Sequence, residues 1–116
     1  MMRKETQKLF KQLAQSYSSN IYYTEKFNKE KYCWTYFIRL CFMPIEMHIQ
    51  IKEYLPTFEK AVHFYIKHQE EYRLSALYFP DTNKNSEIFS FPEQRELIEK
   101  IQKFYAPNSV KFIKDL

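Results

Sequence analysis

The chain has 116 residues, of which 28% are charged and 45% hydrophobic, and this composition predicts one globular domain that buries a core without disulfides or a metal. It contains no glycine, which excludes P-loops, Rossmann turns and the glycine-built oxyanion loops of serine hydrolases. Turn positions with positive φ should then be filled by the next most tolerant residues, asparagine and aspartate. The candidates are Asn20, Asn28, Asp81, Asn83, Asn85 and Asn108.

The net charge of +4 is concentrated in the first 40 residues. They carry eight lysines or arginines and three glutamates, a local net charge of +5, whereas residues 41–80 have −1 and residues 81–116 have 0. A basic region of this kind attracts polyanions such as nucleic acid or an anionic membrane. Aromatic residues make up 19% of the chain, and AT-biased codon usage would also produce an excess of aromatics and lysine.

Residues 3–17 predict an amphipathic helix, because the apolar side chains recur at three- and four-residue spacing. This polar start has no apolar signal-peptide core, so no signal peptide is expected. The cytoplasm is the expected compartment because the two cysteines are expected to be reduced. Residues 18–20, Ser-Ser-Asn, should end the helix. The β-branched and aromatic residues of 21–27 predict a strand, and 28–30 predict a turn.

Residues 32–43 form the most apolar stretch and predict a central strand covered on both faces. It is too short to span a membrane and contains Arg39. Its two cysteines, Cys33 and Cys41, would lie about 26 Å apart along a straight strand, too far for a disulfide, so they are expected to be reduced. After Pro44, residues 45–52 alternate strictly between apolar and polar, which completes a predicted three-stranded meander.

A second helix is predicted over residues 57–72, with Thr57 as its N-cap. Its apolar stripe is Phe58, Ala61, Val62, Tyr65, Ile66 and Tyr72. Residues 74–79 and 87–91 predict strands on either side of a loop over 80–85. A third helix is predicted to begin at Pro92 and to stop by Pro107, followed by a short strand over 110–114.

These elements predict an α+β fold, a single compact domain over residues 1–116 in the order α-βββ-α-ββ-α-β. The sheet is expected to be mostly antiparallel, and barrel-like curling of it stays open. The domain would have about three helices.

The residues that could carry chemistry favour a protein without catalytic activity. His48 lies on a polar strand face, and His63 and His68 would point about 140° apart on the predicted helix, so they cannot share a metal ion. The cysteines lie in a predicted buried strand, which disfavours the thiolate. The carboxylates are scattered, and Glu70, Glu71, Glu93, Glu96 and Glu99 fall on the surfaces of predicted helices. We therefore predict no catalytic residue, no metal site and no cofactor. The sequence leaves open a nucleophilic Cys–His pair that folding brings together, because it does not show which residues are close in space.

The basic and aromatic first half of the chain predicts a nucleic-acid interface, because single strands are held by cations along the backbone and by aromatic faces that stack bases. We predict a non-enzymatic regulator that binds RNA rather than duplex DNA, from a low-GC bacterium or its plasmid or phage. Trp34 is expected to be buried rather than stacked on a base. The predicted binding residues are Tyr22, Tyr23, Lys26, Lys29, Lys31, Tyr32, Arg39 and Lys52.

An alternative prediction is a protein-binding module, either an inhibitor of a host protein or a homodimer, which would use the exposed edge of an aromatic strand. The solvent exposure of the aromatic residues and of Arg39 should separate the two hypotheses. No membrane partner is expected.

In size, in its Lys-, Phe-, Tyr- and Ile-rich composition and in its predicted order of helices and strands, the chain resembles the PrgU-like small regulators of Gram-positive conjugative plasmids. That resemblance implies a PUA-like fold and action on RNA. It rests on no residue motif, so no functional residue is transferred. The lack of glycine departs from ordinary PUA domains, whose loops usually use it.

Overall fold

The computed structural model describes residues 3–17, 21–42, 45–81, 87–90, 92–105 and 114–115. Five long strands form an antiparallel meander in chain order, namely β1 (Ile21–Asn28), β2 (Cys33–Phe42), β3 (Ile45–Tyr54), β4 (Glu59–His68) and β5 (Glu71–Tyr78). Two short strands extend the sheet, β6 (Glu87–Ser90) antiparallel to β5 and β7 (Lys114–Asp115) parallel to β6. The two described helices are α1 (Lys4–Ser16) and α2 (Pro92–Tyr105).

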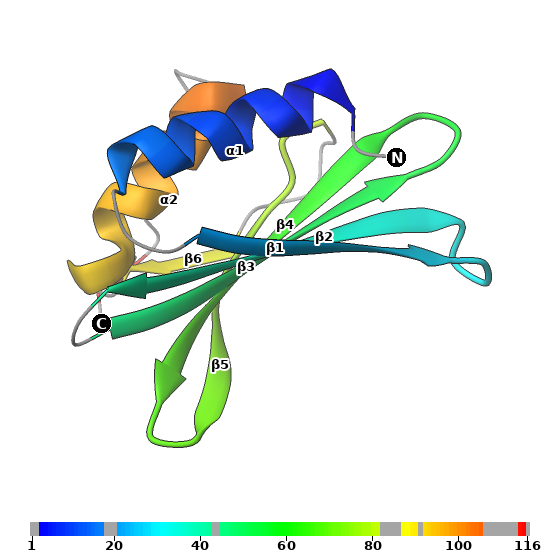
Figure 1. The fold of residues 1–116 in the computed structure, drawn as a ribbon. Helices are drawn as coiled ribbons and strands as arrows, with labels where there is room; N and C mark the ends of the chain where they lie inside the picture. Colours follow the sequence, from blue (N-terminus) through cyan, green and yellow to red (C-terminus); the bar gives the residue numbers. More distant parts are fainter. Residues whose placement is uncertain are drawn as a thin grey trace.

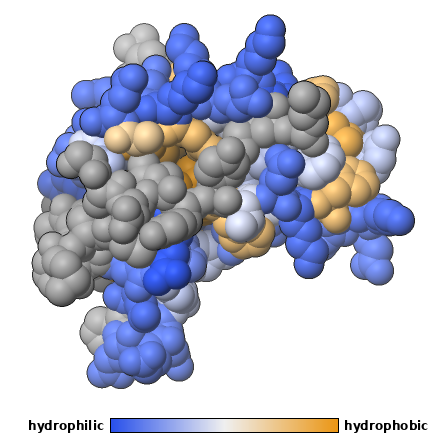
Figure 2. All heavy atoms as spheres, in the orientation of Figure 1, coloured by the Kyte–Doolittle hydropathy of each residue, from blue (hydrophilic) through white to orange (hydrophobic). Residues whose placement is uncertain are grey.

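Both helices lie on the same face of the sheet (Figure 1). The core is the layer between them, where alternate residues of the strands meet one stripe of each helix. Figure 2 shows hydrophilic side chains over the outer side of α1 and hydrophobic ones gathered beneath it. The core residues include Leu9, Phe10 and Leu13 of α1, Leu97, Ile98 and Ile101 of α2, and Tyr36, Ile38, Leu40, Met47, Ile49, Ile51, Val62, Phe64 and Ala76 of the strands.

The sequence-based prediction of an α+β domain with an antiparallel sheet is confirmed. The first helix, the three-stranded meander over residues 21–52 and the helix that begins at Pro92 lie where the periodicity placed them. The two helices and β3 each bury one face, so their apolar residues follow a single period. The prediction that the central strand is covered on both faces holds only in part, because on the side away from the helices Cys33 and Thr35 are buried but Arg39 is exposed. Of the short strand predicted over 110–114, the described part is β7 at Lys114–Asp115, and the rest lies outside the described residues.

The predicted helix over residues 57–72 is wrong, because this segment forms β4, a turn and the start of β5. In β4 the side chains of Val62 and Phe64 are fully buried, whereas those of His63 and Tyr65 are half-buried, so the residues alternate with period two. The Thr57 hydroxyl does not cap a helix but accepts a hydrogen bond from the Glu59 N–H within the β3–β4 turn, at 3.3 Å.

The described part of the chain therefore has two helices and not three, and β4 and β5 extend the meander from three strands to five. The sheet does not close into a barrel, because β1 remains an edge strand at one end of the strand order.

Among the described residues, positive φ occurs in three hairpin turns, and in none of them at an asparagine or aspartate. The residues are Tyr32 (φ 51°), Phe58 (φ 62°) and Gln69 (φ 60°). The prediction for Asn28 and Asp81 is wrong, since their side chains instead accept hydrogen bonds from the N–H groups of Lys31 and Lys60, each at 3.0 Å. The other candidates, Asn20, Asn83, Asn85 and Asn108, lie outside the described residues. Bulky residues in the left-handed region are energetically unfavourable and depend on the surrounding sheet.

Candidate nucleic-acid interface

The two helices leave the other face of the sheet uncovered (Figure 1), and this face is here called the open face. Because directly paired residues of antiparallel strands project to the same face, the strand register defines three rows across it. The first row is Lys26, Thr35, Lys52 and Ala61; the second is Thr24, Phe37, Gln50, His63 and Leu77; the third is Arg39, His48, Tyr65 and Leu74.

The first row places two of the predicted cations side by side. Lys26 on β1 and Lys52 on β3 both pair with Thr35 on the strand between them, so their backbones lie about 10 Å apart. Lys29 and Lys31 are exposed in the β1–β2 turn at the same end of the sheet. Among the described residues, no ion pair neutralises any of these four lysines, which makes this end of the sheet a cationic surface.

Arg39, in the third row, is half exposed but is held by Glu46. The second oxygen of that carboxylate lies 3.2 Å from the Lys67 ammonium, so one glutamate bridges two cations on β2 and β4. Burial alone would raise the pKa of Glu46, but hydrogen bonds from Tyr72, Lys67 and Arg39 outweigh it and lower the pKa to about 2. Arg39 is therefore less available to a phosphate than the four lysines of the cationic surface.

This ion cluster gives a pH-dependent stability. Since the folded-state pKa of Glu46 is near 2 and its ordinary value is 4.5, its stabilising effect is present above pH 4.5 and is lost as the pH falls from there towards 2. We expect Glu46→Gln to lower the free energy of unfolding at pH 7 by about 1 kcal/mol, a value reduced for solvent screening. Urea unfolding of the wild type and of Glu46→Gln at pH 7 and pH 3 should show that the difference between their free energies of unfolding is smaller at pH 3. An equal difference at both pH values would contradict the stabilising role of the ionised Glu46 carboxylate.

Aromatic rings lie beside the cationic surface. Phe37 is half-buried two residues along β2 from Thr35, about 7 Å from the lysine row. His63 and Tyr65 are stacked on β4, with centroids 6.4 Å apart and planes at 10°. Burial lowers the pKa of His63 and of His48, so both rings are neutral at pH 7. The open face thus combines free ammonium groups with uncharged ring faces.

The β4–β5 hairpin bends so that Tyr72 reaches His48 on β3. The register of β4 and β5 shifts between Phe64 and Tyr65, and this bulge leaves Ser75 without a partner residue. The Ser75 hydroxyl donates instead to the Phe64 carbonyl oxygen at 3.2 Å. Tyr72 then stacks on His48 with ring centroids 3.9 Å apart. This contact holds the β4–β5 hairpin against β3 at the end of the open face away from the cationic surface.

The other predicted binding residues lie elsewhere. Tyr32 projects from the β1–β2 turn with 55% of its surface exposed, against the edge of the Phe27 ring. The side chains of Tyr22 and Tyr23 lie outside the described residues. Trp34 is half-buried on the helix-covered side between Phe27 and Tyr36, as expected of a core residue. The helix-covered face of the central strand is therefore mostly scaffold.

His63 and Tyr65 were not predicted to belong to the interface, because both were assigned to a helix. Their alternation with the apolar Val62 and Phe64 was the signal that could have placed them on a strand face.

Cys33 is buried and forms no disulfide, and the side chain of Cys41 lies outside the described residues. Within the described ranges, no group of three or more His, Cys, Asp or Glu side chains could hold a metal ion. The described helices are too short or too polar to cross a bilayer.

The fold and this surface define an α+β protein whose antiparallel sheet is covered by helices on one side and presents a basic, aromatic face on the other. Comparison of the chain with known protein families, with curated proteins and with solved structures gives no match.

Proposed function

We propose that this protein binds single-stranded nucleic acid, RNA rather than duplex DNA, through the open face and the β1–β2 turn, and that it acts as a regulator without catalytic activity. The observation that supports this most is the pairing of Lys26 and Lys52 around Thr35, next to the rings of the second and third rows. A line of cations beside aromatic rings, here half-buried ones, suits the phosphates and bases of a single strand.

In this proposal the phosphates contact Lys26, Lys52 and the turn lysines, Lys29 and Lys31. Bases stack on Phe37 and Tyr65 of the open face and on Tyr32 of the turn, with Tyr22 and Tyr23 as further candidates from β1. Arg39 positions Glu46 and contributes charge more weakly. The amide of Gln50, which is between Phe37 and His63 in the second row, is suited to contact base edges.

Two arguments favour RNA. A sheet with its helices packed on the other side offers no recognition helix to a major groove, whereas sheet faces with aromatics stack unpaired bases. The resemblance to PrgU-like plasmid regulators also implies RNA as the ligand and a bacterial, cytoplasmic protein. A reduced, buried Cys33 agrees with that compartment.

The salt dependence of binding tests the proposal. Four phosphate contacts to a single strand predict a slope of about −2.8 in log K against log salt, which is about a 50-fold loss of affinity between 50 and 200 mM salt. Fluorescence anisotropy with a labelled RNA of about 12 nucleotides measures the slope, and the same sequence as duplex DNA is the comparison. Affinity that does not change with salt, or tighter binding to the duplex, would refute the proposal.

A protein partner is the second candidate, because β1 is an edge strand and no described strand pairs with its outer side, where a partner strand could add. Glu25 and Lys26 are exposed on β1, and charged residues on an edge oppose pairing with a second copy. Analytical ultracentrifugation decides between monomer and homodimer. A dimer that dissociates when Thr24→Pro is introduced would favour the edge-strand interface.

A further inference from the structure

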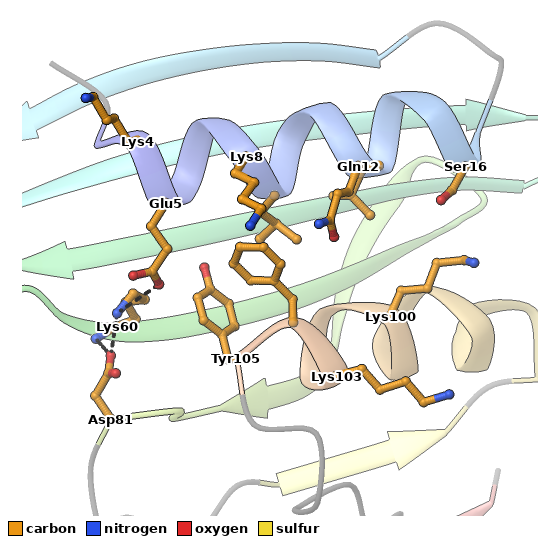
Figure 3. A pocket seen from close by; sticks show the side chains of 13 residues that line it. Lys4, Glu5, Lys8, Gln12, Ser16, Lys60, Asp81, Lys100, Lys103 and Tyr105 are labelled. Atoms are coloured by element: carbon orange, nitrogen blue, oxygen red, sulfur yellow. Dashed lines mark hydrogen bonds and ion pairs between the residues drawn. The ribbon is translucent and has the colours of Figure 1, made fainter.

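A groove lies between α1 and α2, on the side of the molecule opposite the open face. The two helices run antiparallel there, and side chains from both point into the space between them (Figure 3). Its volume is about 960 Å³, the size of a pocket for a small organic molecule rather than for a polymer. Its lining residues include Lys4, Lys8, Gln12 and Ser16 of α1 and Lys100, Lys103, Phe104 and Tyr105 of α2.

The charges of the groove are unbalanced. Its lining has five lysines and two acidic residues, Glu5 and Asp81. Both acids are bound to the same lysine, because the Lys60 ammonium lies 2.9 Å from Asp81 and 3.5 Å from Glu5 with only 6% of its side chain exposed. The other four lining lysines therefore meet groove carboxylates that are already engaged. Among the described residues, only Lys100 of these four has an ion pair elsewhere, with Glu96 at 3.4 Å.

The remainder of the lining is apolar or neutral. Leu9, Leu13 and Phe104 line it with carbon atoms, and the Phe104 ring meets the Tyr105 ring edge-on at 5.1 Å. The Tyr105 hydroxyl has no hydrogen-bond partner among the described residues. Burial, with the nearby carboxylates of Glu5, Glu53 and Asp81, raises the pKa of Tyr105, so its hydroxyl remains a donor at every physiological pH.

We propose that this groove binds a small organic polyanion, a molecule with two or more phosphate groups on an apolar or aromatic body, which is the chemistry of a nucleotide. Phosphates would contact Lys8, Lys100 and Lys103, which approach from the two helices. The organic part would pack on Leu13 and Phe104, and Tyr105 would donate to it. Because the helices and the core separate this groove from the open face, its ligand is distinct from the proposed RNA.

Isothermal titration with adenosine triphosphate tests the proposal, with inorganic triphosphate and adenosine as partial probes. The matched variants are Lys8→Glu and Lys11→Glu, two exposed lysines on the same helix, of which only Lys8 lines the groove. We expect Lys8→Glu to weaken nucleotide binding about tenfold or more, and Lys11→Glu by less than about threefold. Lys103→Glu, on the facing helix, should act like Lys8→Glu.

Three results would overturn the proposal. They are no saturable binding of the nucleotide, equal losses in Lys8→Glu and Lys11→Glu, and inorganic triphosphate binding as tightly as the nucleotide, which would leave the apolar lining without a role. RNA binding measured on Lys8→Glu should lose no more than the screened long-range attraction of one charge, so failure at the groove can be distinguished from failure of the proposed function.

Discussion

Phe64→Ala is expected to lower the free energy of unfolding by about 3–5 kcal/mol, because it removes a large ring from the centre of the core and leaves a cavity. Phe64 is fully buried on β4 and packs beneath the helices. The adjacent Tyr65 projects to the open face and is half-buried, so Tyr65→Ala should cost only about 1 kcal/mol. Urea unfolding followed by circular dichroism measures both values.

The pair of variants also tests the strand itself. A helix over residues 57–72 would bury Tyr65 with Val62 and Ile66 and would leave Phe64 outside the apolar stripe. A larger loss for Tyr65→Ala than for Phe64→Ala would therefore contradict β4. Phe64→Leu serves as a milder variant if the alanine variant does not fold, and it should lose less stability than Phe64→Ala while retaining the same spectrum.

The helix was predicted because this segment fits two periods at once. Phe58, Ala61, Val62, Tyr65 and Ile66 recur at helical spacing, while Val62, Phe64 and Ile66 alternate as in a strand. The sequence also lacks the glycine or asparagine that usually marks a hairpin turn, because the tight turn before β5 has Gln69 at its positive-φ position. Residues 59–68 form a strand because they pair with β3, and this tertiary contact overrides the helical spacing of the local sequence.

The proposed interface could be predicted only in part, for a related reason. Local composition was sufficient to select Lys26, Lys29 and Lys31, because they cluster in sequence. It could not show that Lys52 comes next to Lys26 across β2, since that depends on the strand register. Arg39 looked like a free cation because its partner, Glu46, is seven residues away and reaches it only through the β2–β3 pairing.

Reversing the charges of Lys26 and Lys52 together is expected to weaken RNA binding by about 30- to 100-fold near 100 mM salt. Losing two counterion-releasing contacts accounts for about 2 kcal/mol of binding free energy, and the new glutamates add repulsion of the phosphates. Because two of the four contacts are removed, the salt slope should fall from about −2.8 to about −1.4. Fluorescence anisotropy at several salt concentrations gives both quantities. Both lysines project to the open face, away from the core residues of β2 and β3, so the substitutions leave the core unchanged.

The matched control is Lys8→Glu with Lys11→Glu, which changes the net charge by the same amount on α1, on the helix-covered side of the sheet. If binding depended only on the overall charge, the two double variants would lose affinity equally, and the open face would have no special role. If the open face binds the strand, the α1 variant loses only the long-range attraction, which is screened beyond about 10 Å at 0.1 M salt. A steep salt slope that survives in the Lys26→Glu, Lys52→Glu protein would place the phosphates elsewhere.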